Sequence, residues 1–183
     1  KWKSSEERKP MVLKGARQVG KTWLMKEFGK NYYNSYVYFN FDEEDELKSI
    51  FEVNKNPYRI IELLSMIAGE KIIPGETLVI FDEVQECPEA LNSLKYFKEK
   101  ANDYHVIAAG SLLGTLLAKP KSYPVGMVNL LDIFPLTFDE FLEALDEPYM
   151  PTIAVLKRNS ILRKYSIIVY SKPITIISLL AVC

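Results

Sequence analysis

The sequence predicts an α/β fold in which a mostly parallel five-stranded sheet is covered by helices on both faces, giving three layers. The first observation is that short apolar segments alternate with segments of helical spacing. The second is that these apolar segments are continuous, as is typical of strands buried on both faces of a parallel sheet. The third is a loop bounded by two glycines, residues 15–20, between the first apolar segment and the first helical one.

Five segments are predicted to be strands, because they are rich in β-branched, aromatic and aliphatic residues or are short apolar runs bounded by turn residues. They are residues 10–15, 36–42, 77–83, 105–110 and 127–134.

Helical segments separate these strands. The first helix is predicted from about Thr22 to Phe28, with Gly29 as its C-terminal stop. A second is predicted over residues 58–69, and another begins at Pro88, a residue favoured at the first helical position. The acidic segment 41–48 is predicted to start a solvated helix, because carboxylates are favourable near a helix N-terminus.

A last helix start follows the fifth strand. Thr137 and Glu140 have the spacing of a capping box, and Leu136 and Phe141 stand at the positions of a hydrophobic staple. This helix is predicted to end near Asp146.

Length and composition allow one substantial core, since the chain has 183 residues and is 48% apolar. Cys87 and Cys183 lie far apart without metal-ligand spacing, which favours a reducing, cytoplasmic location. The N-terminal residues carry no apolar signal segment. His105, the single histidine, begins an apolar strand and is expected to be structural.

Charge is distributed unevenly along the chain. Residues 1–147 carry 18 basic and 24 acidic side chains, a net charge of −6, whereas residues 148–183 carry five basic and no acidic ones. This break predicts two parts: a main domain at 1–147 and an atypical basic and apolar tail at 148–183. The acidic main body does not support nucleic-acid binding, although a local basic patch could still provide it. A membrane helix in the tail is not expected, because Lys172 and Pro173 interrupt an already short apolar run.

The loop sequence GARQVGKT matches the pattern G-x-x-x-x-G-K-S/T without a mismatch. Its backbone NH groups are expected to surround a β-phosphate at the N-terminus of the following helix. Lys21 would reach the β- and γ-phosphates, and the Thr22 hydroxyl would bind Mg²⁺. The alternative is a glycine-rich turn with a surface lysine. The predicted nucleotide-binding residues are Gly15, Ala16, Arg17, Gln18, Val19, Gly20, Lys21, Thr22 and Trp23.

Two acidic residues end the strand TLVIFDE. Asp82 is predicted to hold Mg²⁺, and Glu83 to orient and deprotonate a water molecule for attack on the γ-phosphate. The alternative is that both are solvated residues at the end of a strand.

Ser111 follows the strand HVIAAG, which is predicted to lie between the phosphate-loop strand and the acidic strand. Its hydroxyl is a candidate for contact with the γ-phosphate or the attacking water. The alternative, equally supported, is that Ser111 caps a helix starting at Leu112.

These motifs together resemble the prokaryotic AAA-like ATPases in which an N-terminal ATPase domain precedes a C-terminal domain of unknown function. The resemblance rests on RKPMVLKGARQVGKTWLMKEFGK, LVIFDEVQECPEALNSLKYFKE, HVIAAGSLLG and YPVGMVNLLDIFPLTFDEFLEAL, and it covers nearly all of residues 2–147. It implies a P-loop fold of the ASCE type, with Lys21 and Thr22 in the Walker A motif, Asp82 and Glu83 in the Walker B motif, and Ser111 in the sensor position. The tail does not resemble the expected second domain, which suggests a truncated or frameshifted product.

The leading hypothesis is Mg²⁺-dependent ATP hydrolysis coupled to an unknown protein partner or to the missing domain, with a homo-oligomer as a further expectation. The alternative is a nucleotide-gated binding module with negligible turnover. No arginine lies between Arg59 and Arg158, so weak hydrolysis by the isolated chain is predicted. The sequence NKNP at 54–57 lacks the aspartate of a guanine-reading motif, and Glu83 argues against a kinase.

Overall fold

The computed structural model describes residues 2–111, 113, 126–137 and 140. Internal contacts divide the chain into two units, Lys1–Ile133 and Phe134–Cys183. The predicted boundary between residues 147 and 148 lies outside the described residues and stays a prediction. Within the described residues, no helix has the length and apolar character needed to cross a membrane.

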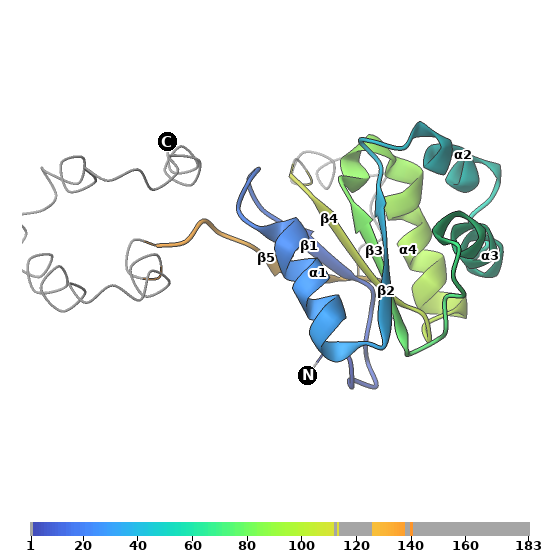
Figure 1. The fold of residues 1–183 in the computed structure, drawn as a ribbon, viewed down its shortest axis with the longest axis horizontal. Coiled ribbons are helices and arrows are strands. Elements are labelled where there is room, and N and C mark those ends of the chain that lie inside the picture. Colours follow the sequence, from blue (N-terminus) through green and yellow to red (C-terminus); the bar gives the residue numbers. More distant parts are fainter. Residues whose placement is uncertain (1, 112, 114–125, 138–139, 141–183) are drawn as a thin grey trace, which may run out of the picture. The chain divides into compact units, whose positions relative to one another are not determined.

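The first unit alternates strands and helices along the chain (Figure 1). Its elements are β1 (Met11–Lys14), α1 (Lys21–Tyr32), β2 (Ser35–Asn40), α2 (Asp45–Val53), α3 (Pro57–Ala68), β3 (Thr77–Asp82), the 3-10 helix η1 (Val84–Glu86), α4 (Pro88–Lys100), β4 (His105–Gly110) and β5 (Asn129–Asp132).

The five strands form one sheet in the order β2-β3-β4-β1-β5, and every neighbouring pair is parallel. The predicted parallel α/β fold is therefore confirmed. Strand β4 lies between β1 and β3, as predicted for the strand that precedes Ser111. Because all strands run the same way, the residues that follow β1, β3 and β4 meet at one edge of the sheet.

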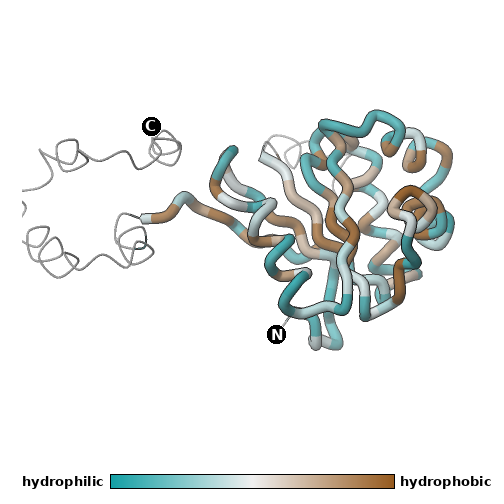
Figure 2. The backbone as a smooth tube through the Cα atoms, viewed as in Figure 1, coloured by the Kyte–Doolittle hydropathy of each residue, from teal (hydrophilic) through white to brown (hydrophobic). Residues whose placement is uncertain are grey.

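Two apolar layers cover the two faces of the sheet. Buried residues of α2, α3 and α4 pack with Val37, Phe39, Val79 and Phe81 on one face. On the other face, Met25 of α1 packs with Leu13, Leu78, Ile80 and Ile107. Figure 1 shows α1 on one side of the sheet and the other three labelled helices on the opposite side. Hydrophobic residues are prominent along the central strands and in α3 (Figure 2).

Gly29 does not end the first helix, so that prediction is wrong. Helix α1 continues to Tyr32, and Tyr33 is its C-cap residue. Gly29 is buried where α1 packs closely on β2, and a Cβ there would lie 2.9 Å from both Cβ and Cγ of Tyr36. The glycine permits a close helix–strand contact and does not serve as a helix stop.

Helix α3 has the ends that the sequence predicts to within one residue. The Asn56 side chain accepts a hydrogen bond from the backbone NH of Tyr58 at 3.1 Å, and Pro57 occupies the first turn. Gly69 follows the helix with a φ of 68°, a left-handed conformation that favours glycine.

In the second unit, the predicted capping box is present. The backbone NH of Thr137 donates to Glu140 Oε2 at 2.8 Å, and the backbone NH of Glu140 donates to Thr137 Oγ1 at 3.3 Å. Phe141 and Asp146, predicted as the staple residue and the helix end, lie outside the described residues. The fifth strand, predicted over 127–134, is confined to Asn129–Asp132.

Candidate functional site

The loop between β1 and α1 presents an uncapped helix N-terminus. Gly20 is the N-cap residue, has a φ of 89° and contributes no side-chain hydrogen bond to the first turn of α1, which contains no acidic residue. Gln18 also has a positive φ, of 61°. A Cβ on Gly15 would collide with the carbonyl oxygen of Ile133, which follows β5. Free NH groups and the positive end of the helix dipole make this loop suited to an anion.

Lys21 is the first residue of α1 and is only 6% exposed. Its Nζ donates to the carbonyl oxygens of Gly15 and Ala16 at 3.0 and 2.6 Å. Burial lowers the pKa of Lys21, and the negative charges of Glu83 and Asp82 partly oppose that shift. The ammonium group is therefore held inside the loop by main-chain carbonyls.

Thr22 and Asp82 are 60 residues apart in sequence and in direct contact in the structure. Thr22 Oγ1 donates to Asp82 Oδ2 at 2.6 Å. Asp82 is 2% exposed, and its Oδ1 accepts from the backbone NH of Glu83 at 3.0 Å. A hydroxyl oxygen beside a carboxylate is a pair of hard oxygen donors of the kind that Mg²⁺ prefers.

Tyr38 of β2 also belongs to this group, and the sequence interpretation missed it. Its hydroxyl donates to Asp82 Oδ2 at 3.0 Å. The run of tyrosines around it is typical of strand and core residues, so composition alone gave no signal. The contact depends on the strand register. Asn40 pairs with Asp82 in the parallel register, and Tyr38 lies two residues before Asn40 on the same face of β2.

Glu83 adopts a left-handed backbone conformation, with φ 50° and ψ 43°. Its Oε2 accepts a hydrogen bond from Gln85 Nε2. The carboxamide oxygen, Gln85 Oε1, is buried without a hydrogen-bond partner among the described residues and lies where a Cβ on Gly110 would collide with it. Gln85, a second residue missed at the sequence level, thus links Glu83 to the end of β4.

Ser111 directly follows β4, between the phosphate loop and the acidic strand. Its Oγ is buried and has no hydrogen-bond partner among the described residues. Leu112, the first residue of the helix that Ser111 was expected to cap, lies outside the described residues. A buried hydroxyl without a partner is costly, so this oxygen fits a position that a ligand atom would satisfy.

The remaining loop residues leave room for a ligand. Ala16, Arg17, Gln18 and Gly20 are exposed, and Val19 is partly buried. Trp23, the residue after Thr22, is 68% exposed. The residues present fit a nucleotide with Mg²⁺: an uncapped helix N-terminus, a lysine in the loop, a hydroxyl–carboxylate pair and a buried hydroxyl without a partner.

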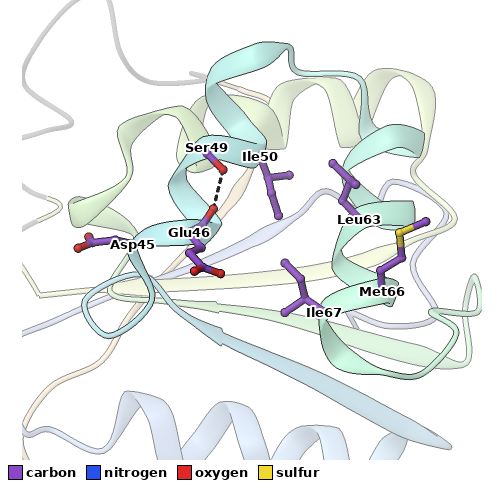
Figure 3. Close-up of a pocket in the computed structure, with 7 residues that line it drawn as sticks. All are labelled: Asp45, Glu46, Ser49, Ile50, Leu63, Met66 and Ile67. Carbon is purple, nitrogen blue, oxygen red and sulfur yellow. Dashed lines mark hydrogen bonds between the residues drawn. The ribbon is translucent and has the colours of Figure 1, made fainter.

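A separate concavity of about 620 Å³ lies between α2 and α3, away from these residues. Figure 3 shows Ile50, Leu63 and Ile67 pointing into it, with Asp45 and Glu46 at its rim. None of the predicted site residues lines it.

His105 and Cys87 are both buried, and for His105 this agrees with the structural role expected from the sequence. His105 is buried, and its Nδ1 is 2.7 Å from the Tyr33 hydroxyl. Burial, together with Arg8 and Lys3, lowers the pKa of His105 to about 4. Cys87 precedes α4 but contributes no side-chain cap, and burial raises the pKa of its thiol.

A parallel sheet with a phosphate-type loop after β1 and an acidic pair at the end of β3 defines a P-loop NTPase domain. A family model described as an AAA domain matches residues 7–142, so the chain belongs to this family of AAA domains. No curated protein sequence matches the chain as a close relative.

Solved structures support the same fold. A Walker-type ATPase of Pyrococcus abyssi aligns with a TM-score of 0.52 and 18% identity, covering 80% of this chain and 55% of that one. The Drosophila ORC bound to DNA aligns with a TM-score of 0.50 and 17% identity, covering 85% of this chain and 44% of that one. The chain therefore spans about half the length of each of these structures.

Proposed function

We propose that this chain binds ATP with Mg²⁺ at the loop 15–22 and hydrolyses it slowly, and that the nucleotide state acts on an attached domain or a protein partner. One observation carries the proposal: the loop lysine, the Thr22–Asp82 pair and Glu83 come together at one edge of the sheet, from segments about 60 residues apart. Family membership supports an ATPase domain.

In this proposal the loop NH groups and Lys21 bind the phosphates. Lys21 would exchange its hydrogen bonds to the carbonyls of Gly15 and Ala16 for bonds to the β- and γ-phosphates. Thr22 and Asp82 would hold Mg²⁺. When bound, this ion would neutralise part of the negative charge of the phosphates.

Glu83 would act as the general base. It is partly buried next to Asp82, and Gln85 holds its carboxylate. From this position it would orient a water molecule and accept its proton as the bond from the water oxygen to the γ-phosphorus forms and the bond from the γ-phosphorus to the β–γ bridging oxygen breaks, releasing ADP and phosphate. Ser111 Oγ would donate to the γ-phosphate or to that water.

A nucleotide-gated binding module is the second candidate, and the arginines favour it for the isolated chain. Arg8 donates to main-chain carbonyls of Lys3 and Asn102, and Arg59 donates to the carbonyl of Ile50. Among the arginines that the structure describes, Arg17 is then the one close to the predicted phosphates, because it lies in the loop itself. In this candidate, Arg17 would bind phosphate together with the rest of the loop, and a partner would supply the arginine that stabilises charge in the transition state.

Equilibrium binding tests the proposal. ATP titrated calorimetrically into the protein with Mg²⁺ should bind, and Lys21→Ala should weaken the affinity at least about tenfold, since one charge-assisted contact is worth roughly 1.5–3 kcal/mol. Lys30→Ala, an exposed lysine at the far end of α1, is the matched control and should bind as the wild type does. Equal affinity of Lys21→Ala and wild type would contradict the proposed site.

A further inference from the structure

The carboxylate of Asp82 is held by three hydrogen-bond donors. Its Oδ1 accepts from the backbone NH of Glu83, and its Oδ2 accepts from the hydroxyls of Thr22 and Tyr38. Thr22 is itself a ligand in the proposed magnesium site. Tyr38 is therefore, among the described residues, the one side chain that bonds to Asp82 without a role of its own in that site.

The sheet geometry explains why a tyrosine reaches this carboxylate. In the parallel register Tyr38 lies beside Ile80, one pleat below Asp82, and side chains two residues apart share a face. Tyr38 is thus on the face covered by α1, and its long ring spans the distance of one pleat. An aliphatic residue here would pack like Leu78 and Ile80 but would leave Asp82 Oδ2 with a single partner.

Helix α1 fixes the ring from the other side. Lys26 Nζ lies 3.6 Å from the centroid of the Tyr38 ring. Thr22 and Lys26 are four residues apart, hence on one face of α1. The same helix face therefore contacts both Asp82, through Thr22, and the residue that orients Asp82, through Lys26.

We propose that Tyr38 is a positioning residue of the magnesium site, which orients the carboxylate of Asp82 for the metal through the hydrogen bond to Oδ2. The inference rests on the proposed function, because it concerns the metal held by Thr22 and Asp82. Outer partners of this kind orient metal ligands, and their loss weakens metal affinity by roughly 10- to 100-fold.

Tyr38→Phe removes one oxygen atom and keeps the ring. Fluorescent ADP would be bound to each protein in EDTA, and Mg²⁺ would then be titrated to obtain its apparent affinity without any turnover. Tyr38→Phe should weaken the affinity for Mg²⁺ roughly tenfold or more while leaving ADP binding in EDTA unchanged. Thermal unfolding of each variant checks that the fold is retained.

Tyr36→Phe is the matched control. Tyr36 lies two residues earlier on the same face of β2, and its hydroxyl has no hydrogen-bond partner within the described residues. Removal of the Tyr36 hydroxyl should change the affinity for Mg²⁺ by less than about twofold.

The outcomes separate the inference from the function on which it rests. Wild-type affinity for Mg²⁺ in Tyr38→Phe, with nucleotide binding intact, would overturn the role of Tyr38 alone. Weaker ADP binding by the same factor with and without Mg²⁺ would also overturn it, since the effect would then be on the nucleotide pocket in general. Failure of the wild-type protein to bind nucleotide would contradict the proposed function and the inference together.

Discussion

At the scale of single residues, the proposed base is held by its neighbours in an uncommon conformation. Glu83 has a positive φ, which is unfavourable for a residue with a Cβ and persists only where surrounding contacts impose it. Those contacts include the hydrogen bond from Gln85 to its carboxylate. Because Gly110 has no side chain, the Gln85 carboxamide fits beside the end of β4. Gln85 therefore contacts both the end of β4 and the carboxylate of Glu83.

Loss of the Gln85 side chain should therefore slow hydrolysis and spare binding. Gln85→Ala is expected to lower the single-turnover rate about tenfold, because a hydrogen bond to a charged group is worth roughly 1.5–3 kcal/mol. Glu86→Ala, an exposed residue of the same 3-10 helix, serves as the control. An unchanged rate in Gln85→Ala, or a loss of ATP affinity that accounts for the slower rate, would show that Gln85 does not position Glu83.

Residue types and spacing predicted Lys21, Thr22, Asp82 and Glu83 because each belongs to a short motif in the chain. The contacts of Tyr38 and Gln85 could not be predicted in the same way. Tyr38 meets Asp82 only through the register of β2 on β3, and Gln85 meets Gly110 only after β4 joins the sheet. Sequence reasoning is strongest for local motifs and weakest for partners supplied by strand pairing.

At the scale of elements, Gly29 serves the packing of α1 against β2 and does not end the helix. Glycine often ends a helix, which is why Gly29 was expected to end this one. The ring and Cβ of Tyr36 instead occupy the space where a side chain at position 29 would lie. Local propensity predicted the wrong helix end because the glycine is required by the contact with Tyr36 and not by a helix terminus.

Gly29→Ala measures that contact. In a helix interior, alanine in place of glycine raises the free energy of unfolding by about 1 kcal/mol. Overpacking against a rigid neighbour lowers it by about 1–3 kcal/mol. The steric cost should win, because the nearest Tyr36 atoms are at the base of its side chain. Urea unfolding should show a net loss of about 1 kcal/mol, against less than about 0.5 kcal/mol for Lys30→Ala. A more stable Gly29→Ala protein would refute the packing explanation.

At the scale of the whole molecule, the alternation of apolar strands and helices was sufficient to predict the parallel sheet. The place of β4 between β1 and β3 was also predicted, and it brings Ser111 to the edge of the sheet that carries the loop and the acidic pair. The end of β5 and the boundary of α1 were predicted less well, because both depend on neighbouring segments and not on local composition.

The central claim is that one site binds and slowly hydrolyses ATP, with Glu83 as the base. The most direct measurement is single-turnover hydrolysis of γ-labelled ATP with Mg²⁺, by excess wild-type protein and by Glu83→Gln, with bound nucleotide measured in the same samples. Hydrolysis by the wild type slower than about one per second, and at least about 100-fold slower in Glu83→Gln with ATP still bound, would support the account. Equal rates in the two proteins would contradict the role of Glu83, and bound but unhydrolysed ATP in both would favour the nucleotide-gated module.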